Sequence, residues 1–268
     1  MPRVFRRLIA VAAILSLVSP AHAWGPQGHR ISTRIAMARL TPKAAGAIRE
    51  LLNPGDTLVD VCNWADHEGH DVVPDSAPWH YVNVPLDAPR YSAKYCGERG
   101  CVVSKIKEFR KILADPKAPR KERQRALLFL VHFVEDVHQP LHVGDNRDRG
   151  GNNTQVQFAG KGTNLHRVWD SDILHHVGGN DNVWVQRLTP LLTPEHVKAW
   201  SSGSVEEWAD ESLIAARKAY MWPPGSRTPM PSGTILGNDY VRMADPIVRE
   251  RLAQAGVRLA NELNGIFK

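Results

Sequence analysis

The sequence lacks several features that mark common protein classes. Beyond residue 23, no run approaches the roughly 20 apolar residues that a membrane-spanning helix requires, which argues against a membrane-spanning protein. The chain also has no internal repeat and no low-complexity tract, and its Lys and Arg residues form no basic block. Strand-like alternation of apolar and polar residues is scarce, so the pattern favours a mostly helical protein.

Cysteine is rare too, with three among 268 residues. Cys96 and Cys101 enclose a short loop with two glycines and can close a local disulfide in an oxidising compartment. Cys62 is then left over. The alternative is three unpaired thiols, which such a compartment disfavours.

The amino-terminal segment has the pattern of a secretory signal peptide. Three arginines precede an apolar run, residues 8–18, and residues 19–23 end in an Ala-x-Ala cleavage pattern. We expect cleavage after Ala23 and export to the periplasm or out of the cell, without stable membrane association. The alternative is a retained membrane anchor, for which the apolar run is short. Cleavage lowers the formal net charge from +6 to +3, a mild basicity that is compatible with a polyanionic substrate but does not require one.

Residues 24–268 are long enough for one large domain with a substantial core. Residues 154–158 alternate as in a strand and precede two glycines, which predicts a short hairpin. Residues 223–233, with several Pro and Gly, are typical of a long surface loop. We therefore predict a single all-α domain with long loops and at most a short β-hairpin. Two helices are expected near the start of this domain, and the others cover residues 102–113, 121–137, 164–175, 183–192, 205–220 and 246–263.

Two pairs of His and Asp carry the strongest chemical signal. His132 and Asp136 are four residues apart in a predicted helix, and His166 and Asp170 repeat the spacing. Residues four apart share one helix face, so each pair can bind one metal ion. A single pair of this kind is more often an ordinary surface pair.

Further ligand-type side chains strengthen the case. Asp66, His80 and His29 each lie close to a tryptophan, and His142 follows the Gln-Pro that ends the helix of Asp136. With the two pairs, they supply five histidines and three aspartates. Such a set of nitrogen and oxygen ligands suits zinc, and it indicates two or more metal sites.

In these positions the chain resembles the S1/P1 nucleases, a family related in fold to the zinc-dependent bacterial phospholipases C. The resemblance runs the length of residues 24–268 and rests on motifs in the same order. They are Trp24-Gly25 with His29, Trp64-Ala65-Asp66, His80-Tyr81-Val82, Cys96 to Cys101, His132-Phe133-Val134-Glu135-Asp136 leading to Gln139-Pro140-Leu141-His142, Gly150-Gly151-Asn152, Asn164-Leu165-His166 with Trp169-Asp170, and Ala255 to Ala260. The resemblance implies an all-helical domain with three zinc ions at the bottom of a cleft.

The resemblance also implies which groups hold the three Zn²⁺ ions. The sets are Asp66, His80, His132 and Asp136 for the first ion, His142, His166 and Asp170 for the second, and His29, Asp136 and the amino nitrogen and carbonyl oxygen of Trp24 for the third. Asp136 would bridge two ions. Because Trp24 gains a free amine only after cleavage behind Ala23, export would complete the site.

A substrate-binding scheme follows from the same resemblance. Asp66 is the expected catalytic residue, which orients the attacking water, and Tyr81 is expected to stack on a base. Asn83 and Asn152 are expected to bind the base edge. Several family members have a basic side chain where this chain has Gly69, so transition-state stabilisation must come from elsewhere. They commonly have Asp at the position of Asn83, whose amide both donates and accepts, which leaves the base preference open.

These expectations favour an endonuclease and 3'-nucleotidase that cleaves single-stranded DNA and RNA to 5'-phosphates, with no protein partner implied. A flexible single strand can place a base in a pocket more readily than a stacked duplex can. The alternative enzyme is a zinc-dependent phospholipase C, but those lipases use Glu where this chain has Asp170, and His29 follows Trp24 more closely than in them. A third possibility is a zinc-binding protein without turnover, which Gly69 and Asn83 alone favour.

Several other histidines and tryptophans receive no role in this scheme. His67 and His70, like His175 and His176, are more simply explained as solvated residues of loops or helix ends. His138 is able to line the cleft but has no assigned role. Packing is the ordinary explanation for Trp184, Trp200, Trp208 and Trp222.

Overall fold

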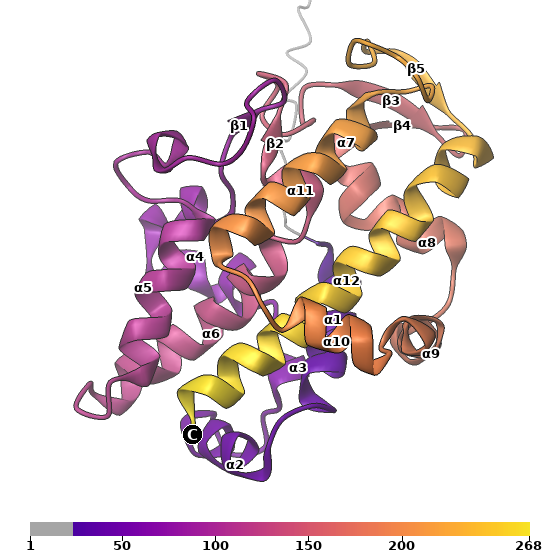
Figure 1. Cartoon of the computed structure of the whole chain (residues 1–268). Coiled ribbons are helices and arrows are strands. Elements are labelled where there is room, and N and C mark those ends of the chain that lie inside the picture. The colour runs from indigo at the N-terminus through magenta and orange to yellow at the C-terminus, as the bar shows by residue number, and fades with distance from the viewer. Residues whose placement is uncertain (1–23) are drawn as a thin grey trace, which may run out of the picture.

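A computed structural model describes residues 24–268, so the predicted signal peptide, residues 1–23, lies outside the described residues. Helices dominate the described chain, which confirms the predicted all-α class (Figure 1). The α-helices are α1 (Pro26–Met37), α2 (Pro42–Leu51), α3 (Leu58–Val61), α4 (Glu68–Val72), α5 (Val102–Ala114), α6 (Arg120–Asp136), α7 (Leu165–Arg167), α8 (Ile173–Val177), α9 (Asp181–Leu188), α10 (Pro194–Trp200), α11 (Val205–Tyr220) and α12 (Asn238–Ile266).

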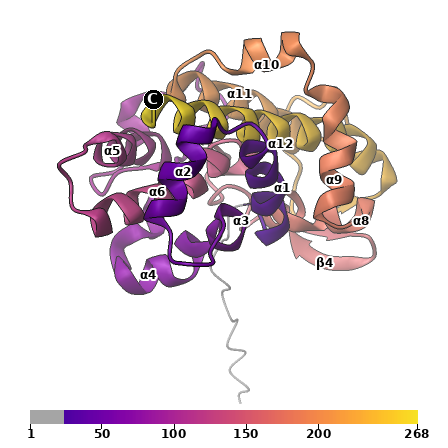
Figure 2. The ribbon, with the colours of Figure 1, turned by 90° about the horizontal axis from the view of Figure 1, so that it is seen from below.

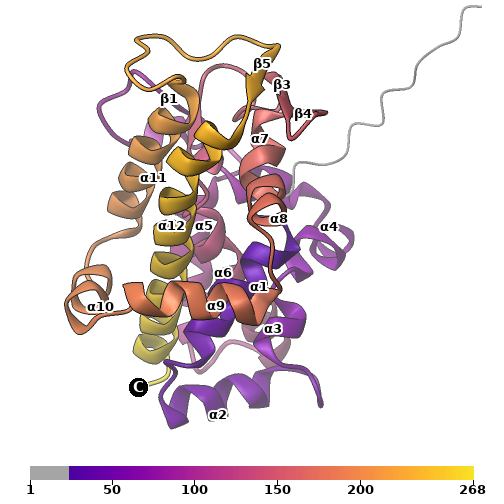
Figure 3. The same cartoon turned by 90° about the vertical axis from the view of Figure 1, so that its right-hand side faces the viewer.

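The core is organised around α12, a helix of 29 residues whose middle, residues 251–260, is buried throughout. Helices α1, α6 and α11 pack against it. Figure 3 shows α11 and α12 side by side, with α9 lying across α12. Seen from below, α1 and α2 lie against the same helix (Figure 2). The C-terminal helix therefore contacts two of the helices, α1 and α6, that carry candidate metal ligands.

Gly256 allows α12 to lie very close to α1. A Cβ atom at this position would lie 2.6 Å from Cβ of Ile35 and 2.7 Å from the backbone oxygen of Ser32. The hydroxyl of Ser32 also donates a hydrogen bond of 3.1 Å to the carbonyl of Leu252. Because α1 carries His29, this close contact fixes one candidate ligand relative to α12.

Helix α6 is buried over its second half, where each residue from Ala126 to Asp136 is shielded from solvent. A helix that is apolar on all faces belongs in a core. Helix α5 covers one side of it, and Phe109 of α5 stacks on Phe129 with ring centroids 4.8 Å apart. The polar residues at the end of α6 are therefore carried into the protein interior.

The last helix is longer than the sequence predicted. It begins at Asn238 rather than at Pro246, which lies inside it. Proline usually ends a helix because it lacks an N–H and its ring meets the preceding turn. Here the turns before Pro246 are buried through Tyr240 and Ala244, so tertiary packing outweighs the local preference of proline.

The strands form two small sheets. The predicted hairpin is present as β3 (Gln155–Phe158) and β4 (Lys161–Asn164), which pair antiparallel. A third strand, β5 (Thr234–Leu236), pairs parallel with β3, which the sequence analysis did not predict. The other sheet is a parallel pair of two-residue strands, β1 (Val84–Pro85) and β2 (Gly144–Asp145). This pair ties the segment that follows His80 to the segment that follows His142.

The cysteines have the predicted arrangement. Cys96 and Cys101 form a disulfide, and Cys62 is a free thiol in the core.

Within residues 24–268, no helix combines the length and the apolar character needed to cross a membrane.

Replacing Gly256 by Ala should destabilise the fold, because the added methyl group overlaps Ile35 and the backbone of Ser32. We expect the free energy of unfolding to fall by about 1–3 kcal/mol, as for other overpacked cores. Urea titration followed by circular dichroism measures it. Gly265→Ala, in the same helix but with nothing within 4 Å of the new methyl group, is the control and should cause no loss. Equal effects of the two substitutions would contradict the close-packing argument.

Candidate metal centre

The last turns of α6 provide two neighbouring ligand-type side chains. His132 and Asp136 face the same side, with Nε2 of His132 at 3.4 Å from Oδ2 of Asp136. Both side chains are fully buried. The alternative interpretation, an ordinary surface pair on a helix, is therefore wrong.

Asp66 and His80 join this pair from two 3-10 segments that they end. Oδ1 of Asp66 lies 3.2 Å from Nε2 of His132 and 3.4 Å from Nδ1 of His80. Nδ1 of His80 also lies 3.1 Å from Oδ2 of Asp136. The structure thus brings together the four side chains expected around the first ion.

His29 of α1 approaches the other oxygen of Asp136. Its Nε2 lies 3.5 Å from Oδ1 of Asp136, and its ring stacks on that of His132 with centroids 4.1 Å apart. The oxygen Oδ2 of Asp136 faces His80 and His132. Asp136 therefore presents its two oxygens to two different groups, as a bridging carboxylate would.

Trp24 lies two residues before the start of α1 and is fully buried. The next residue, Gly25, donates its backbone N–H to the carbonyl of Asp170 over 2.8 Å. This bond ties the start of α1 to the segment that carries Asp170. The structure thus places Trp24 in the interior, next to a residue that contacts the segment of Asp170.

His142, His166 and Asp170 form another group, whose ligand atoms lie within 4.8 Å of one another. Nε2 of His166 is 3.4 Å from Oδ2 of Asp170, and the rings of His142 and His166 stack with centroids 5.0 Å apart. The helix predicted over residues 164–175 is interrupted by a π-helical turn, Val168–Asp172, which carries Asp170. Such turns are rare in proteins, and those that occur are often found at functional sites.

Backbone carbonyls fix the orientation of three of these imidazole rings through their Nδ1 atoms. The bonds run from His132 to Cys62 (2.8 Å), from His142 to His80 (2.8 Å) and from His166 to Gly150 (2.6 Å). A proton on Nδ1 leaves a lone pair on Nε2 that can bind a metal ion. These hydrogen bonds therefore favour the tautomer that a metal ligand needs.

Several buried atoms in these groups have no hydrogen-bond partner in the described part of the chain. They include Nε2 of His29, Nε2 of His142 and Oδ1 of Asp136. A buried polar atom left unpaired costs about 1–3 kcal/mol. Bound metal ions would satisfy all three atoms, so the residues fit a cluster of cations.

Burial shifts the pKa values of the carboxylates and of the imidazoles in opposite directions. It raises the pKa of Asp136 and of Asp170 well above the usual range, so both resist ionisation. It lowers the pKa of His29 and of His80, so both resist protonation. Imidazoles bind metal ions in their neutral form, and carboxylates bind them in their ionised form. A divalent cation supplies the positive charge that stabilises the ionised carboxylates.

Glu135 is a candidate functional residue that the sequence analysis missed. It is fully buried, and its carboxylate accepts a bond of 2.6 Å from Nδ1 of His29 and one of 2.7 Å from the hydroxyl of Thr33. A carboxylate in this position fixes the ring of a ligand histidine and raises its basicity. The available signal was a second acid beside Asp136 in an otherwise apolar stretch.

Tyr81 and Asn83 lie on the extended segment that leaves His80. Both are exposed, whereas Val82 and Val84 between and after them are buried. Alternation in an extended chain places Tyr81 and Asn83 on the same side. The ring of Tyr81 is therefore accessible for stacking, at 38% exposure.

Asn152 belongs to the loop that orients His166 through the carbonyl of Gly150. It is half-buried, and its side-chain amide donates a bond of 2.9 Å to the carbonyl of Arg149. Asn152 thus lies beside the group of His142 and His166, with one of its donors engaged within the loop.

The positions around Gly69 also bear on the site. A Cβ atom at Gly69 would lie 3.2 Å from the backbone oxygen of Trp64, so close packing accounts for the glycine. His70, predicted to be solvated, is half-buried with its ring 5.6 Å from that of His80. Its Nδ1 is 3.2 Å from the hydroxyl of Ser76. His70 therefore borders the group of Asp66 and His80.

Comparison with known proteins agrees with this geometry. The family model described as S1/P1 Nuclease matches residues 24–268. Endonuclease 2 of Arabidopsis thaliana is 35% identical, over 97% of this chain and 96% of its own length. Nuclease S1 of Aspergillus oryzae is 29% identical over 95% and 96%, and Nuclease P1 of Penicillium citrinum is 26% identical over 91% and 97%.

Replacing Glu135 by Gln should weaken metal binding at the group of His29, His132 and Asp136. The amide keeps the shape but lacks the negative charge that makes His29 a stronger ligand, and the loss of such a partner typically weakens metal affinity about 10–100-fold. Metal content after dialysis against a chelator measures the effect. Thr33→Val, which leaves the contact between Glu135 and His29 intact, is the control. Unchanged metal retention in the Gln variant would argue against this role.

Proposed function

The chain belongs to the S1/P1 nuclease family, and we propose that it is an exported enzyme that uses three zinc ions to hydrolyse single-stranded DNA and RNA. Family membership itself makes the chain a nuclease that acts on nucleic acids. The proposed products are 5'-phosphates, and 3'-nucleotides are the proposed second class of substrate.

One observation carries the proposal: the buried groups of His and Asp adjoin one another, either through a shared residue or through a direct hydrogen bond. His132 belongs both to the group with Asp66 and His80 and to the group with His29 and Asp136. The third group, around His142, is joined to the first because Nδ1 of His142 bonds to the carbonyl of His80. Adjoining groups support a cluster of ions rather than isolated sites.

Zinc suits this cluster because the available ligands are imidazoles, carboxylates and one amine. The proposed sets are Asp66, His80, His132 and Asp136, then His142, His166 and Asp170, and finally His29, Asp136 and the backbone atoms of Trp24. When bound, zinc supplies positive charge that neutralises the attacked phosphate and makes water more acidic.

The chain's own residues then orient the substrate. The side chain of Asp66 is 4% exposed, and its carboxylate can accept a proton from the attacking water. Tyr81 offers an accessible ring to a base, and stacking of this kind tolerates different bases. Asn83 and Asn152 offer amides to the base edge. A single strand is preferred because a base must leave its stack to reach these groups.

The amino nitrogen of Trp24 completes the third zinc set only after cleavage behind Ala23. Before cleavage this nitrogen belongs to a peptide bond, whose resonance removes the lone pair that a metal would bind. Export to the periplasm or out of the cell thus precedes completion of the site. Because the relatives named above are endonucleases and nucleases, we favour nucleic acid over phospholipid as the substrate.

The purified exported protein should release nucleotides from denatured DNA and from RNA much faster than from duplex DNA, and it should leave lecithin intact. A chelator should abolish hydrolysis, because the proposed reaction depends on bound metal ions. Zn²⁺ should restore it, because imidazole and carboxylate ligands suit zinc. Acid-soluble nucleotide, phosphocholine release and mass spectrometry of the product ends are the measurements. Hydrolysis of lecithin alone, or hydrolysis that survives complete metal removal, would contradict the proposal.

One extra residue ahead of Trp24 should remove one metal ion and most of the activity, because it returns the nitrogen of Trp24 to a peptide bond. Metal content per protein and the rate on denatured DNA are measured for residues 24–268 with and without the extra residue. The same residue added after Lys268 is the control. An amino-terminally extended protein with full metal content and full rate would refute the third set.

A further inference from the structure

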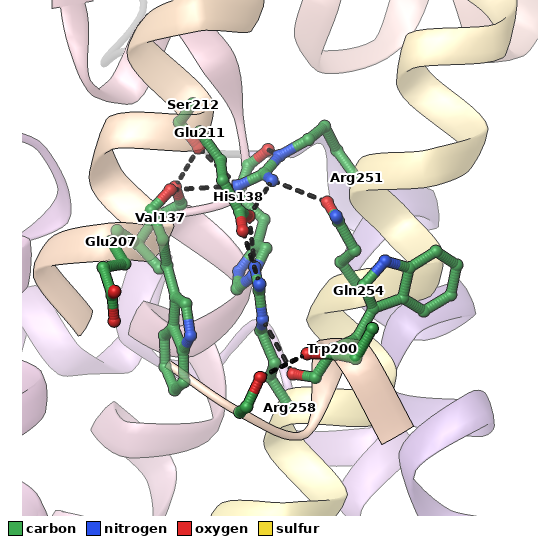
Figure 4. Close-up of polar contacts among 12 residues, drawn as sticks. Val137, His138, Trp200, Glu207, Glu211, Ser212, Arg251, Gln254 and Arg258 are labelled. Atoms are coloured by element: carbon green, nitrogen blue, oxygen red, sulfur yellow. Dashed lines mark hydrogen bonds and ion pairs between the residues drawn. The ribbon is translucent and has the colours of Figure 1, made fainter. Parts of the chain in front are cut away.

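His138 occupies the turn between two proposed ligands, two residues after Asp136 and four before His142. The sequence analysis allowed it a place in the cleft, but the structure buries it completely. It belongs to none of the metal-binding groups found among residues 24–268. Figure 4 shows it among side chains from α11 and α12 instead.

Two arginines of α12 bind this histidine at its side chain and at its backbone. Nη1 of Arg258 donates to Nε2 of His138 over 2.9 Å, and Nε of Arg251 donates to its carbonyl over 3.3 Å. Nδ1 of His138 donates to the carbonyl of Val134 over 2.6 Å, which leaves Nε2 as the acceptor for Arg258. Both arginines are 3% exposed.

Glu211 of α11 pairs with both arginines (Figure 4). It accepts bonds of 2.6 and 2.7 Å from Arg258 and one of 2.6 Å from Arg251. Arg251 also donates to the hydroxyl of Ser212 over 2.7 Å, and this hydroxyl donates to the carbonyl of Val137. The cluster therefore holds the backbone at two successive residues of the turn.

Backbone carbonyls balance the excess of positive charge in this cluster. Arg258 donates to the carbonyl of Trp200 at the end of α10, and Arg251 donates to the carbonyl of Trp208, each over 3.1 Å. Helix α6 ends just before His138, so the two cations lie at the negative end of its dipole.

The other side of the same turn touches the proposed ligands. Gln139 donates from its side chain to Oδ1 of Asp170 over 2.6 Å. Its backbone carbonyl accepts the N–H of His142 over 3.0 Å. A displacement of the turn would therefore move His142 and release Asp170.

We infer that Arg258 and Arg251 are positioning residues for the metal group of His142, His166 and Asp170. They anchor the turn at His138, and Gln139 transmits that position to the ligands. The inference rests on the proposed function in one respect, since it takes this group to hold a metal ion. It also gives a role to Arg258 within the motif from Ala255 to Ala260, which contains no proposed ligand.

Stability alone does not explain such a cluster. Replacing a buried ion pair by well-packed apolar side chains is often neutral or stabilising. Directional bonds to a carbonyl and to an imidazole, in contrast, hold a turn in one place. A metal site needs its ligands within about 0.5 Å of their working positions, which makes such bonds useful here.

The test is Arg258→Met in the protein of residues 24–268, in which Glu211 keeps its ion pair with Arg251. Zinc content is measured at a series of buffered free zinc concentrations, and the visible spectrum is recorded after loading with Co²⁺. We expect one ion to bind about tenfold more weakly and the cobalt spectrum to change, as when other partners of metal ligands are lost. Arg258→Lys keeps the charge without the planar fork, so its effect should be intermediate.

The matched control is Arg110→Met, which removes an ion pair between α5 and Glu262 of α12 without touching the turn. It should lower the melting temperature but leave zinc content and the cobalt spectrum unchanged. Arg258 variants that are folded at the assay temperature and bind every ion with parental affinity and spectrum would overturn the inference. A parent protein that binds no zinc would overturn the proposed function and the inference with it.

Discussion

The proposed metal centre depends on keeping three aspartates ionised inside the protein. Asp66, Asp136 and Asp170 are at most 7% exposed, and their oxygens approach one connected set of imidazoles. Burial raises the pKa of Asp136 and Asp170, so the interior by itself favours the protonated carboxyl group. Nearby positive charge opposes this preference. The proposed zinc ions would supply that charge, and the same ions would attract a phosphodiester anion.

This constraint explains why each ligand has a support behind it. A cation cluster forms only if the lone pairs converge, and a free imidazole ring can rotate away. Carbonyls fix His132, His142 and His166, while Glu135 fixes His29. The charge of the supporting side chain differs with the group that it holds. An acid lies behind the imidazole of His29, whereas arginines bind the carbonyl and the imidazole of His138 in the turn.

Local spacing predicted the part of the centre that one helix holds. His132 and Asp136 share a face because four residues nearly complete a helical turn. Asp66, His80 and His29 approach them through tertiary contacts that no periodicity encodes, so only the family resemblance joined them to the same site. The contact between Arg258 and His138 joins residues 120 positions apart in the sequence. The sequence alone does not distinguish a buried arginine from a solvated one. Strand β5 escaped prediction for the same reason, since its pairing with β3 is non-local.

Helix α12 couples the proposed metal groups to one another. Gly256 brings it against α1, which carries His29, while Arg251 and Arg258 bind the turn that leads to His142. At 1.5 Å per residue, these contacts lie within roughly 11 Å of each other along one stiff helix. A shift of α12 would therefore displace His29 and His142 together rather than separately. The spacing between the groups is set by a single rigid element, so the proposed ions bind to one unit and not to independent sites.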